Sequence, residues 1–197
     1  CPWPRDMNKE EKKKLLQKAL DYHHNGRLNL ADDIYKEILS VDQSDFDANH
    51  LHATILSQNH EYAKAIKFFA QAYEHQTPTC ELLNNYAIAL RNLRAFSECE
   101  NMLLEAVELD KYFAKSYINL SNCFISQNKY EDAIDILRKS IKLNLNLTKA
   151  HHSITKILFS KLSRESDQST LDEIREHLNF LRKVNDKSII AGFGRIE

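Results

Sequence analysis

A group of asparagine side chains recurs in the middle of the chain at a spacing suited to ligand binding. Asn119 follows Asn85 after a 34-residue interval, and Asn84, Asn92 and Asn122 flank them. A carboxamide both donates and accepts hydrogen bonds, so a row of such groups can bind the backbone of an extended peptide without selecting its side chains. The alternative interpretation is that these asparagines are ordinary solvated helix residues.

Basic and imidazole side chains surround these asparagines. They are His23, His24, His50, Arg91, Lys115, Lys149, His152 and Lys156. Positive charge beside a carboxamide row would favour an acidic peptide or segment. Asp47 and Glu81 fall on the same predicted face and dilute this charge, so a mixed, solvated face is the competing interpretation. The predicted peptide-binding surface comprises Asn84, Asn85, Arg91, Asn92, Lys115, Asn119, Asn122, His152 and Lys156.

No pattern typical of catalysis or metal binding occurs in the sequence. His23–His24 and His151–His152 are adjacent pairs, and neighbours on a helix point about 100° apart, which suits separate faces rather than one metal ion. H-E-x-x-H and G-x-S-x-G do not occur, and 3 glycines are too few for a phosphate-binding loop. We therefore predict that this chain is not an enzyme and has no catalytic residue, metal site or cofactor.

The cysteines and the overall composition indicate a protein without a disulfide framework. Cys1, Cys80, Cys99 and Cys123 form no C-x-x-C pair, and Cys99 and Cys123 occupy positions where a small apolar residue is expected. The net charge of -1 gives no global attraction to nucleic acid or anionic membrane. No apolar run is long enough to span a bilayer or to act as a signal peptide. We predict a cytoplasmic protein whose partner is neither nucleic acid nor membrane.

The elements that must position these side chains are helices, because 3 Gly and 3 Pro in 197 residues leave few turn formers. The clearest stretch is Ala114 to Leu147. Its apolar residues recur at three- and four-residue spacing in two runs, and the polar Gln127–Lys129 between the runs predicts a turn. The two runs are Tyr117, Leu120 and Phe124, followed by Ala133, Ile134, Leu137 and Ile141.

The same pattern returns throughout the chain with a 34-residue period. The matching positions are Leu28, Tyr62, Phe96 and Tyr130, then Ala31, Ala65, Cys99 and Ala133, then Tyr35, Phe69, Leu103 and Leu137. With its second-helix stretches YEDAIDILRKSIKL and FSECENMLLEAVELD, this pattern resembles the tetratricopeptide repeat. Small residues at fixed places let paired helices approach closely, and large ones fill the grooves between them. Aromatic residues such as Tyr62 and Tyr130 are expected in the core.

This resemblance implies an all-α fold, a right-handed superhelical solenoid of antiparallel helix pairs, in which the first helix of each pair lines a concave groove. Asn85 and Asn119 then take the sixth place of their repeats, similar to the asparagine ladder of O-GlcNAc transferase. The lysine clamp of the chaperone-binding members is missing, so no recognition of a chaperone carboxylate is expected. The fifth places are Leu16, His50, Asn84, Ile118 and His152.

The 34-residue period also predicts the boundaries of the repeats. Four regular repeats are expected at 12–45, 46–79, 80–113 and 114–147. A fifth, modified pair is expected over 148–185, with a longer loop at Ser163–Ser169 and a second helix at Thr170–Val184. Residues 186–197 would begin a further, truncated helix capped by Ser188, and residues 1–11 would hold a leader or tag remnant and the start of the first helix. The uncapped end predicts either a chain that continues beyond Glu197 or a dimer contact that covers it.

The leading functional prediction is a module that binds a peptide or protein segment in the concave groove. The alternative is the N-terminal docking or regulatory region of a larger transferase, because Asn25–Leu39 resembles bacterial arrays that precede sulfotransferase or O-GlcNAc-type glycosyltransferase domains. A third hypothesis is a structural scaffold that self-associates through its C-terminal end.

Overall fold

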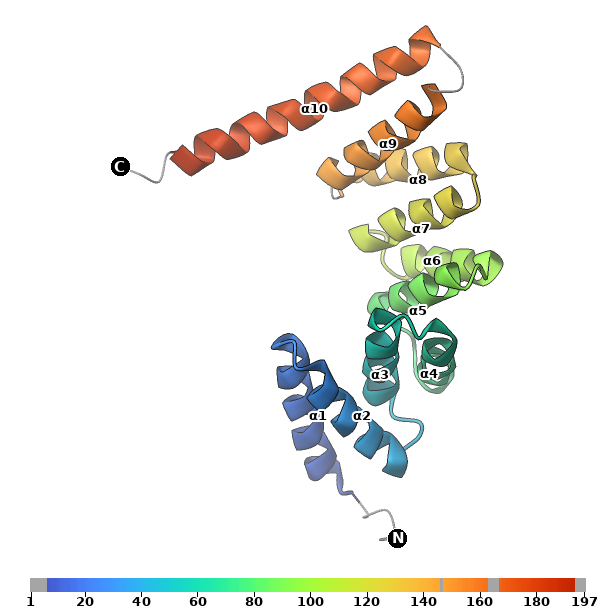
Figure 1. Ribbon diagram of the computed structural model, residues 1–197, viewed down its shortest axis with the longest axis vertical. Coiled ribbons are helices and arrows are strands. Elements are labelled where there is room, and N and C mark those ends of the chain that lie inside the picture. Colours follow the sequence, from blue (N-terminus) through green and yellow to red (C-terminus); the bar gives the residue numbers. More distant parts are fainter. Residues whose placement is uncertain (1–6, 146, 163–166, 194–197) are drawn as a thin grey trace. The chain divides into compact units, whose positions relative to one another are not determined.

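The computed structural model describes residues 7–145, 147–162 and 167–193 and shows an all-helical protein (Figure 1). Among these residues there is no β-strand, which confirms the predicted fold class. The helices are α1 (Lys9–His24), α2 (Leu28–Val41), α3 (Phe46–Gln58), α4 (Tyr62–His75), α5 (Cys80–Asn92), α6 (Phe96–Leu109), α7 (Ala114–Ser126), α8 (Tyr130–Lys142), α9 (Leu147–Leu162) and α10 (Gln168–Phe193).

Consecutive helices form antiparallel pairs that begin at a regular interval. First helices α3, α5 and α7 begin at Phe46, Cys80 and Ala114, which confirms the predicted 34-residue period, and second helices α4, α6 and α8 begin at the same interval. Side chains cap several of the first helices, as at α3, where the Asp45 carboxylate accepts a hydrogen bond of 2.9 Å from the Ala48 backbone N–H. The predicted turn at Gln127–Lys129 is confirmed, because α7 ends at Ser126.

The turn inside each regular pair contains one residue with positive φ. These residues are Gly26, His60, Arg94 and Asn128, which follow the same 34-residue period. The next residue donates its backbone N–H to a carbonyl in the last turn of the preceding helix, as Lys129 does to Phe124 at 2.9 Å. This left-handed cap closes the first helix and reverses the chain into the second.

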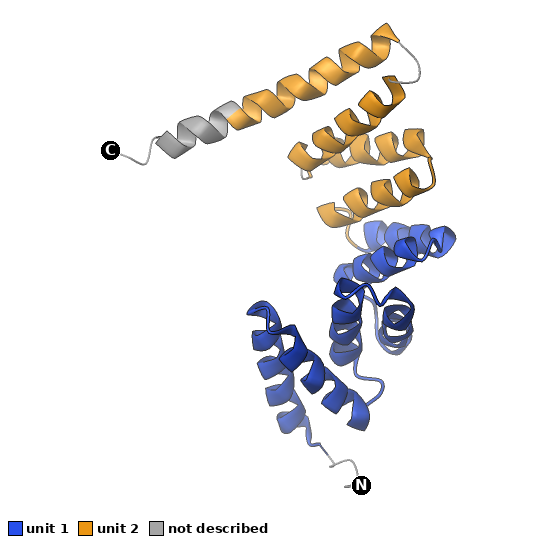
Figure 2. Ribbon diagram, in the orientation of Figure 1, with its two compact units in different colours: residues 1–109 blue, residues 110–197 orange. Residues whose placement is uncertain are grey.

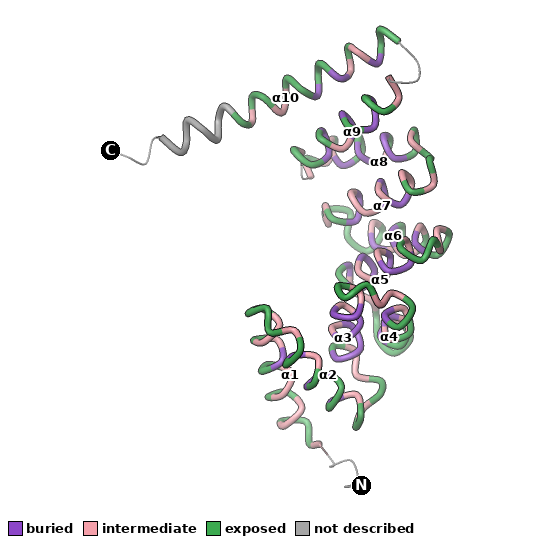
Figure 3. The backbone as a smooth tube through the Cα atoms, viewed as in Figure 1, coloured by how far each residue is buried: buried purple, intermediate pink, exposed green. Residues whose placement is uncertain are grey.

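The core contains the small and large side chains that the sequence predicts, and Figure 3 shows buried positions along the described helices. The small series Ala31, Ala65, Cys99 and Ala133 is buried, and so is the large series Tyr35, Phe69, Leu103 and Leu137. Small residues permit close helix approach, and each large residue fills the groove that this approach creates. Cys123 is also fully buried, as a small apolar residue should be.

The chain divides into two compact units, residues 1–109 and residues 110–197 (Figure 2). Unit 1 contains α1 to α6, and unit 2 contains α7 to α10. Within each unit, the first helix of one pair packs on the preceding pair, as α9 packs on α8. We describe each unit by itself.

The C-terminal part of unit 2 differs from the sequence prediction. α10 is one helix of 26 residues, so the separate helix expected from Ser188 does not begin there. Asp186–Ser188 is polar but contains no Gly or Pro, and a polar stretch without such residues can continue a helix. Residues 163–166 of the predicted loop lie outside the described residues, and Gln168 and Ser169 are already helical. The predicted leader at residues 1–6 and the chain end at 194–197 also lie outside them.

Across the described ranges, no helix combines the length and the apolar character that crossing a membrane requires.

Candidate functional site

The predicted site residues lie on the first helices of three pairs and belong to both units. Asn84, Asn85, Arg91 and Asn92 are on α5 of unit 1, whereas Lys115, Asn119 and Asn122 are on α7 and His152 and Lys156 on α9 of unit 2. The predicted row from Asn85 to Asn119 therefore runs from one unit into the other and stays a prediction. The local surroundings of each residue are described below.

Asn84 does not lie on an exposed binding face, so its inclusion in the predicted surface was wrong. Only 1% of its surface is exposed, and its amide nitrogen donates to the Cys80 carbonyl at 2.8 Å. A carboxamide four residues after a helical carbonyl can bond back to its own helix, and burial here makes that bond necessary. The sequence analysis assigned Asn84 and Asn85 to the same binding surface because they are adjacent in the chain. Adjacent residues of a helix point in different directions, so only one of the two can face that surface.

Asn85 is half-buried between α3 and α5, and its orientation is fixed by two side chains of α3. Its amide nitrogen lies 3.2 Å from His50 Nε2 and 3.3 Å from Thr54 Oγ1. Burial lowers the pKa of His50 to about 4, so its ring is uncharged at neutral pH, and with the ring proton on Nδ1 its Nε2 accepts from Asn85. With the amide nitrogen engaged, Asn85 presents its carbonyl oxygen as an acceptor for a ligand N–H.

A pocket of about 280 Å³ lies beside Asn85 in unit 1. Its lining comes from two first helices and the start of a second helix: Thr54, Ser57, Gln58, Tyr62, Asn85 and Ile88. Tyr62 was expected in the core, but it is only half-buried and lines this pocket. Arg91 is half-buried and lies outside this lining. Asn92 is exposed and donates to the Ile88 carbonyl of its own helix at 2.8 Å.

A second pocket, of about 370 Å³, lies between α7 and α9 in unit 2. It contains three of the predicted site residues, and its full lining is Asn122, Ile125, Tyr130, His152, Ser153, Lys156, Ile157 and Ser160. His152 and Lys156 are exposed at this pocket, and Asn122 is half-buried. Lys115 and Asn119 lie on α7 outside this lining, with Lys115 exposed.

The two pockets occupy equivalent places in the repeat pattern, two repeats apart. Five lining positions of the first pocket reappear in the second after a shift of two repeat periods. The equivalent pairs are Thr54 and Asn122, Ser57 and Ile125, Tyr62 and Tyr130, Asn85 and Ser153, and Ile88 and Lys156. The sequence analysis identified Tyr62 and Tyr130 as members of a 34-residue series but assigned them to the core, and so did not predict that they line the pockets. An aromatic residue at the head of a second helix can fill the core with its ring edge and still line the groove.

Electrostatic character differs between the two sets of first helices. The acidic residues expected to dilute the positive charge, Asp47 and Glu81, are on α3 and α5 of unit 1. By contrast, α9 in unit 2 carries Lys149, Lys156 and Lys161 and no Asp or Glu. The pocket between α7 and α9 also has no carboxylate in its lining. The first helix α9 of unit 2 thus carries only basic charged side chains, whereas α3 and α5 of unit 1 carry carboxylates.

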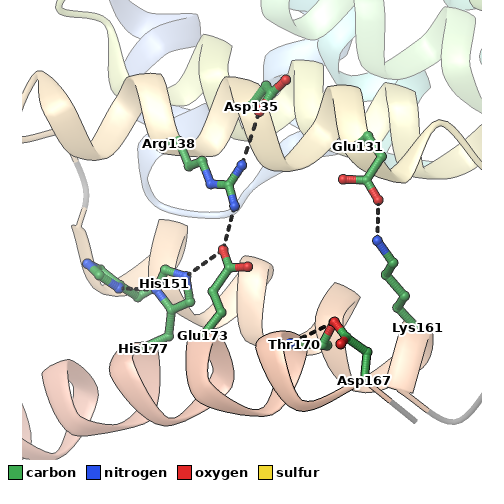
Figure 4. Close-up of polar contacts among 9 residues, drawn as sticks. All are labelled: Glu131, Asp135, Arg138, His151, Lys161, Asp167, Thr170, Glu173 and His177. Atoms are coloured by element: carbon green, nitrogen blue, oxygen red, sulfur yellow. Dashed lines mark hydrogen bonds and ion pairs between the residues drawn. The ribbon is translucent and has the colours of Figure 1, made fainter. Parts of the chain in front are cut away.

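Polar contacts join α9 to its neighbours α8 and α10 (Figure 4). His151 Nδ1 and His177 Nδ1 lie 2.6 Å apart, and His177 Nε2 lies 3.6 Å from Glu173. Glu173 accepts a hydrogen bond of 2.7 Å from Arg138 of α8. Burial, and secondly His177, lowers the pKa of His151. His151 is thus buried while His152 is exposed, the separation of faces expected from their adjacency.

In the described parts of the chain, no group of three or more His, Cys, Asp or Glu side chains could hold a metal ion. The close His151–His177 contact is a hydrogen bond, in which one imidazole donates and the other accepts.

The chain is a helical-repeat protein. Its helices are paired and regular in length, its turns have periodic caps, and grooves lie between its first helices. Residues 114–147 match the family model of the tetratricopeptide repeat. This segment begins with the α7·α8 pair, which is thus identified as a tetratricopeptide repeat. The resemblance expected from the sequence is supported at the repeat in which its pattern is clearest.

Curated relatives match parts of the chain. Coatomer subunit epsilon from Dictyostelium discoideum is 27% identical over 59% of this chain and 40% of its own length. A DnaJ homolog subfamily C member 7 homolog from the same organism is 32% identical over 44% of this chain and 17% of its own length. The type IV pilus assembly protein PilF from Pseudomonas aeruginosa is 26% identical over 74% of this chain and 59% of its own length. The chain thus spans less than two thirds of each relative.

Solved structures share the fold. YrrB, described as a TPR protein with an unusual peptide-binding site, has a TM-score of 0.70 and 18% identity, covering 91% of this chain and 94% of its own. MamA from Desulfovibrio magneticus RS-1 has a TM-score of 0.75 and 15% identity, covering 91% and 99%. Pseudomonas aeruginosa PilF has a TM-score of 0.67 and 20% identity, covering 94% and 89%. At these identities the structures establish the fold alone, that of a tetratricopeptide-repeat protein.

Proposed function

We propose that this chain is a docking module that binds an extended peptide or protein segment along its first helices. The observation that carries the proposal is the pair of repeat-equivalent pockets, one beside Asn85 and one beside Asn122. The first combines Ile88 with a tyrosine and a carboxamide, and the second combines Ile125 and Ile157 with a tyrosine and a carboxamide. Apolar walls with a few placed polar groups are typical of sites that bind a ligand.

In this proposal, Asn85, Asn119 and Asn122 bind the ligand backbone, while Arg91 and Lys115 adjust its charge preference. Asn85 accepts from a backbone N–H, because His50 and Thr54 already engage its amide nitrogen. Ile125 and Ile157 contact apolar ligand side chains at the second pocket, and Lys156 pairs with an acidic one. The peptide-binding description of YrrB supports such a role for this fold, although the residues of that site are its own.

The first prediction concerns the asparagines. An array of labelled peptides is screened with the chain, and captured peptides are then titrated against an Asn85→Ala/Asn119→Ala/Asn122→Ala variant. Losing a hydrogen bond in a covered site costs about 1–2 kcal/mol, so each substitution should weaken binding roughly five- to thirtyfold. Fluorescence anisotropy measures the change.

Asn101→Ala is the matched control, because Asn101 is exposed on the second helix α6 and lines neither described pocket. Circular dichroism melting checks that all variants fold. Peptides captured equally well by the triple variant would place binding on another surface.

The alternative prediction of an attached transferase domain concerns sequence beyond this chain, and no described residue tests it. Cytoplasmic residence and the exclusion of nucleic acid likewise stay predictions.

A further inference from the structure

A groove of about 460 Å³ lies between α9 and α10, on a different side of α9 from most of the pocket described above. Its lining residues are His152, Thr155, Lys156, Phe159, Leu178 and Leu181. Phe159 is 50% exposed and Leu178 is 43% exposed, although both are large and apolar. Clustered apolar side chains at a groove with a polar edge are typical of a surface that another molecule covers.

Repeat equivalence identifies the shape of the molecule that fits this groove. The lining residues of α9 are the 34-residue equivalents of Ile118, Ser121, Asn122 and Ile125 on α7. On α7, Ile118 and Ile125 pack against the core cluster that contains Ala150 and Ile154 of α9, and Ser121 is fully buried. The corresponding surface of the α7·α8 pair thus packs in part against a helix. The α9·α10 groove offers a helix the equivalent positions, with His152 and Lys156 where α7 has Ile118 and Asn122.

The charge of the groove identifies the polar side chains of that helix. No carboxylate is among the lining residues, and α9 has no acidic residue along its length. Lys161 is paired with Glu131 at 2.6 Å, whereas Lys156 has no ion pair within the described part of the chain. A lysine and an imidazole at the edge of an apolar groove complement carboxylates that flank an apolar face.

We propose that the groove between α9 and α10 binds an amphipathic, acidic helix of a partner protein. The apolar face of that helix covers Phe159, Leu178 and Leu181, and its carboxylates pair with Lys156 and His152. This contact is additional to the extended segment in the proposed function and uses a different groove, although the two grooves share His152 and Lys156.

The test uses two labelled probes and variants of the chain. One probe is a helical peptide of leucine, alanine and glutamate, with leucines on one helical face and glutamates beside it. The other has every glutamate replaced by lysine. Fluorescence anisotropy should show the glutamate probe binding the wild-type chain at least about tenfold more tightly, and Leu178→Lys should weaken that binding at least about tenfold. Lys156→Glu should reverse the preference in favour of the lysine probe.

Asn179→Ala is the matched control, because Asn179 is an exposed residue of α10 that lines neither this groove nor the α7–α9 pocket, so it should leave probe binding unchanged. Equal binding of the two probes, undiminished binding to Leu178→Lys, or no binding at all would overturn the proposal. Sedimentation of the wild-type chain gives a further outcome. If the wild-type chain self-associates, Leu178→Lys abolishes that association and neither probe binds, the groove is occupied by a second copy of this chain. That result would also overturn the proposal. The proposed function is tested separately, by the peptides of the array that bind the wild-type chain and no longer bind the triple asparagine variant.

Discussion

At the scale of single residues, burial decides which polar groups are available to a ligand. Asn84 and Asn85 are chemically identical neighbours, yet one bonds inside its own helix and the other presents a carbonyl oxygen at a pocket. The availability of Asn85 depends in turn on His50, whose unprotonated Nε2 accepts from it. Histidine protonation is thus linked both to stability and to the geometry of the candidate site.

The pH dependence of unit 1 tests this link. The pKa of His50 is lowered by burial from 6.5 to about 4, so the folded state takes up its proton less readily than the unfolded state. Protonation of His50 therefore does not lower the free energy of unfolding above pH 6.5. As pH falls from 6.5 toward 4, it lowers the free energy of unfolding by roughly 3 kcal/mol in total. Urea denaturation at several pH values should show this loss.

His50→Gln is the matched variant, because glutamine can hydrogen-bond with Asn85 and does not titrate in this range. Its stability should change less between pH 6.5 and 4 than that of the wild-type chain. Identical pH profiles for the two proteins would show that His50 does not control the dependence.

A second pH effect is expected at the α9–α10 contact. The pKa of His151 is lowered by burial and secondly by His177, so the folded state takes up this proton less readily than the unfolded state and loses stability as pH falls below 6.5. Glu173 and Glu176 of α10 oppose this effect, and Arg138 of α8 adds positive charge beyond Glu173. Amide hydrogen exchange in α9 and α10 should therefore accelerate on acidification, after correction for the intrinsic rate. His177→Gln should reduce that acceleration, and an unchanged pH response in this variant would contradict the prediction.

At the scale of elements, the turns are the most regular feature of the chain. Four turns use a left-handed residue at the same place, but only Gly26 has no Cβ to oppose that conformation. His60, Arg94 and Asn128 adopt φ of 64°, 62° and 61° at equivalent places between two paired helices. The fold thus imposes a local conformation that the side chains disfavour.

Substitution of Arg94 tests this strain. Arg94→Gly should be more stable than Arg94→Ala by about 1 kcal/mol, because both remove the side chain but only glycine relieves the left-handed backbone. The alanine variant controls for the loss of the Arg94 contact with the Phe96 ring, 5.8 Å from its centroid. Urea denaturation measures the difference.

Gly26→Ala is the converse change and should destabilise by about 1 kcal/mol, since φ there is +71° and nothing within 4 Å would contact the new Cβ. Equal stability of Arg94→Gly and Arg94→Ala would show that the turn relaxes at no cost.

At the scale of the whole molecule, each unit can be understood from its own helix pairs. Unit 1 carries the asparagine with fixed orientation and also the acidic residues Asp47 and Glu81. Unit 2 carries the groove helix without carboxylates and the exposed apolar side chains of Phe159 and Leu178. The first helices α3 and α5 of unit 1 therefore carry carboxylates, whereas the charged side chains on α9 of unit 2 are all basic.

The sequence by itself determined the helix pairs, their 34-residue period, the turn at Gln127–Lys129 and the buried small and large series. These features depend on local propensity and on which side of each helix is apolar, and both are visible in residue spacing. The length of α10 was missed, because a polar stretch without Gly or Pro resembles a boundary while remaining compatible with a helix.

Only the tertiary structure decided which predicted site residues are available. It removed Asn84 from the surface, oriented Asn85 through His50 and Thr54, and brought Asn122, His152 and Lys156 to one pocket. It also exposed the groove between α9 and α10. The physical reason is that burial and side-chain partners arise between helices far apart in sequence, so the spacing within one helix carries no record of them.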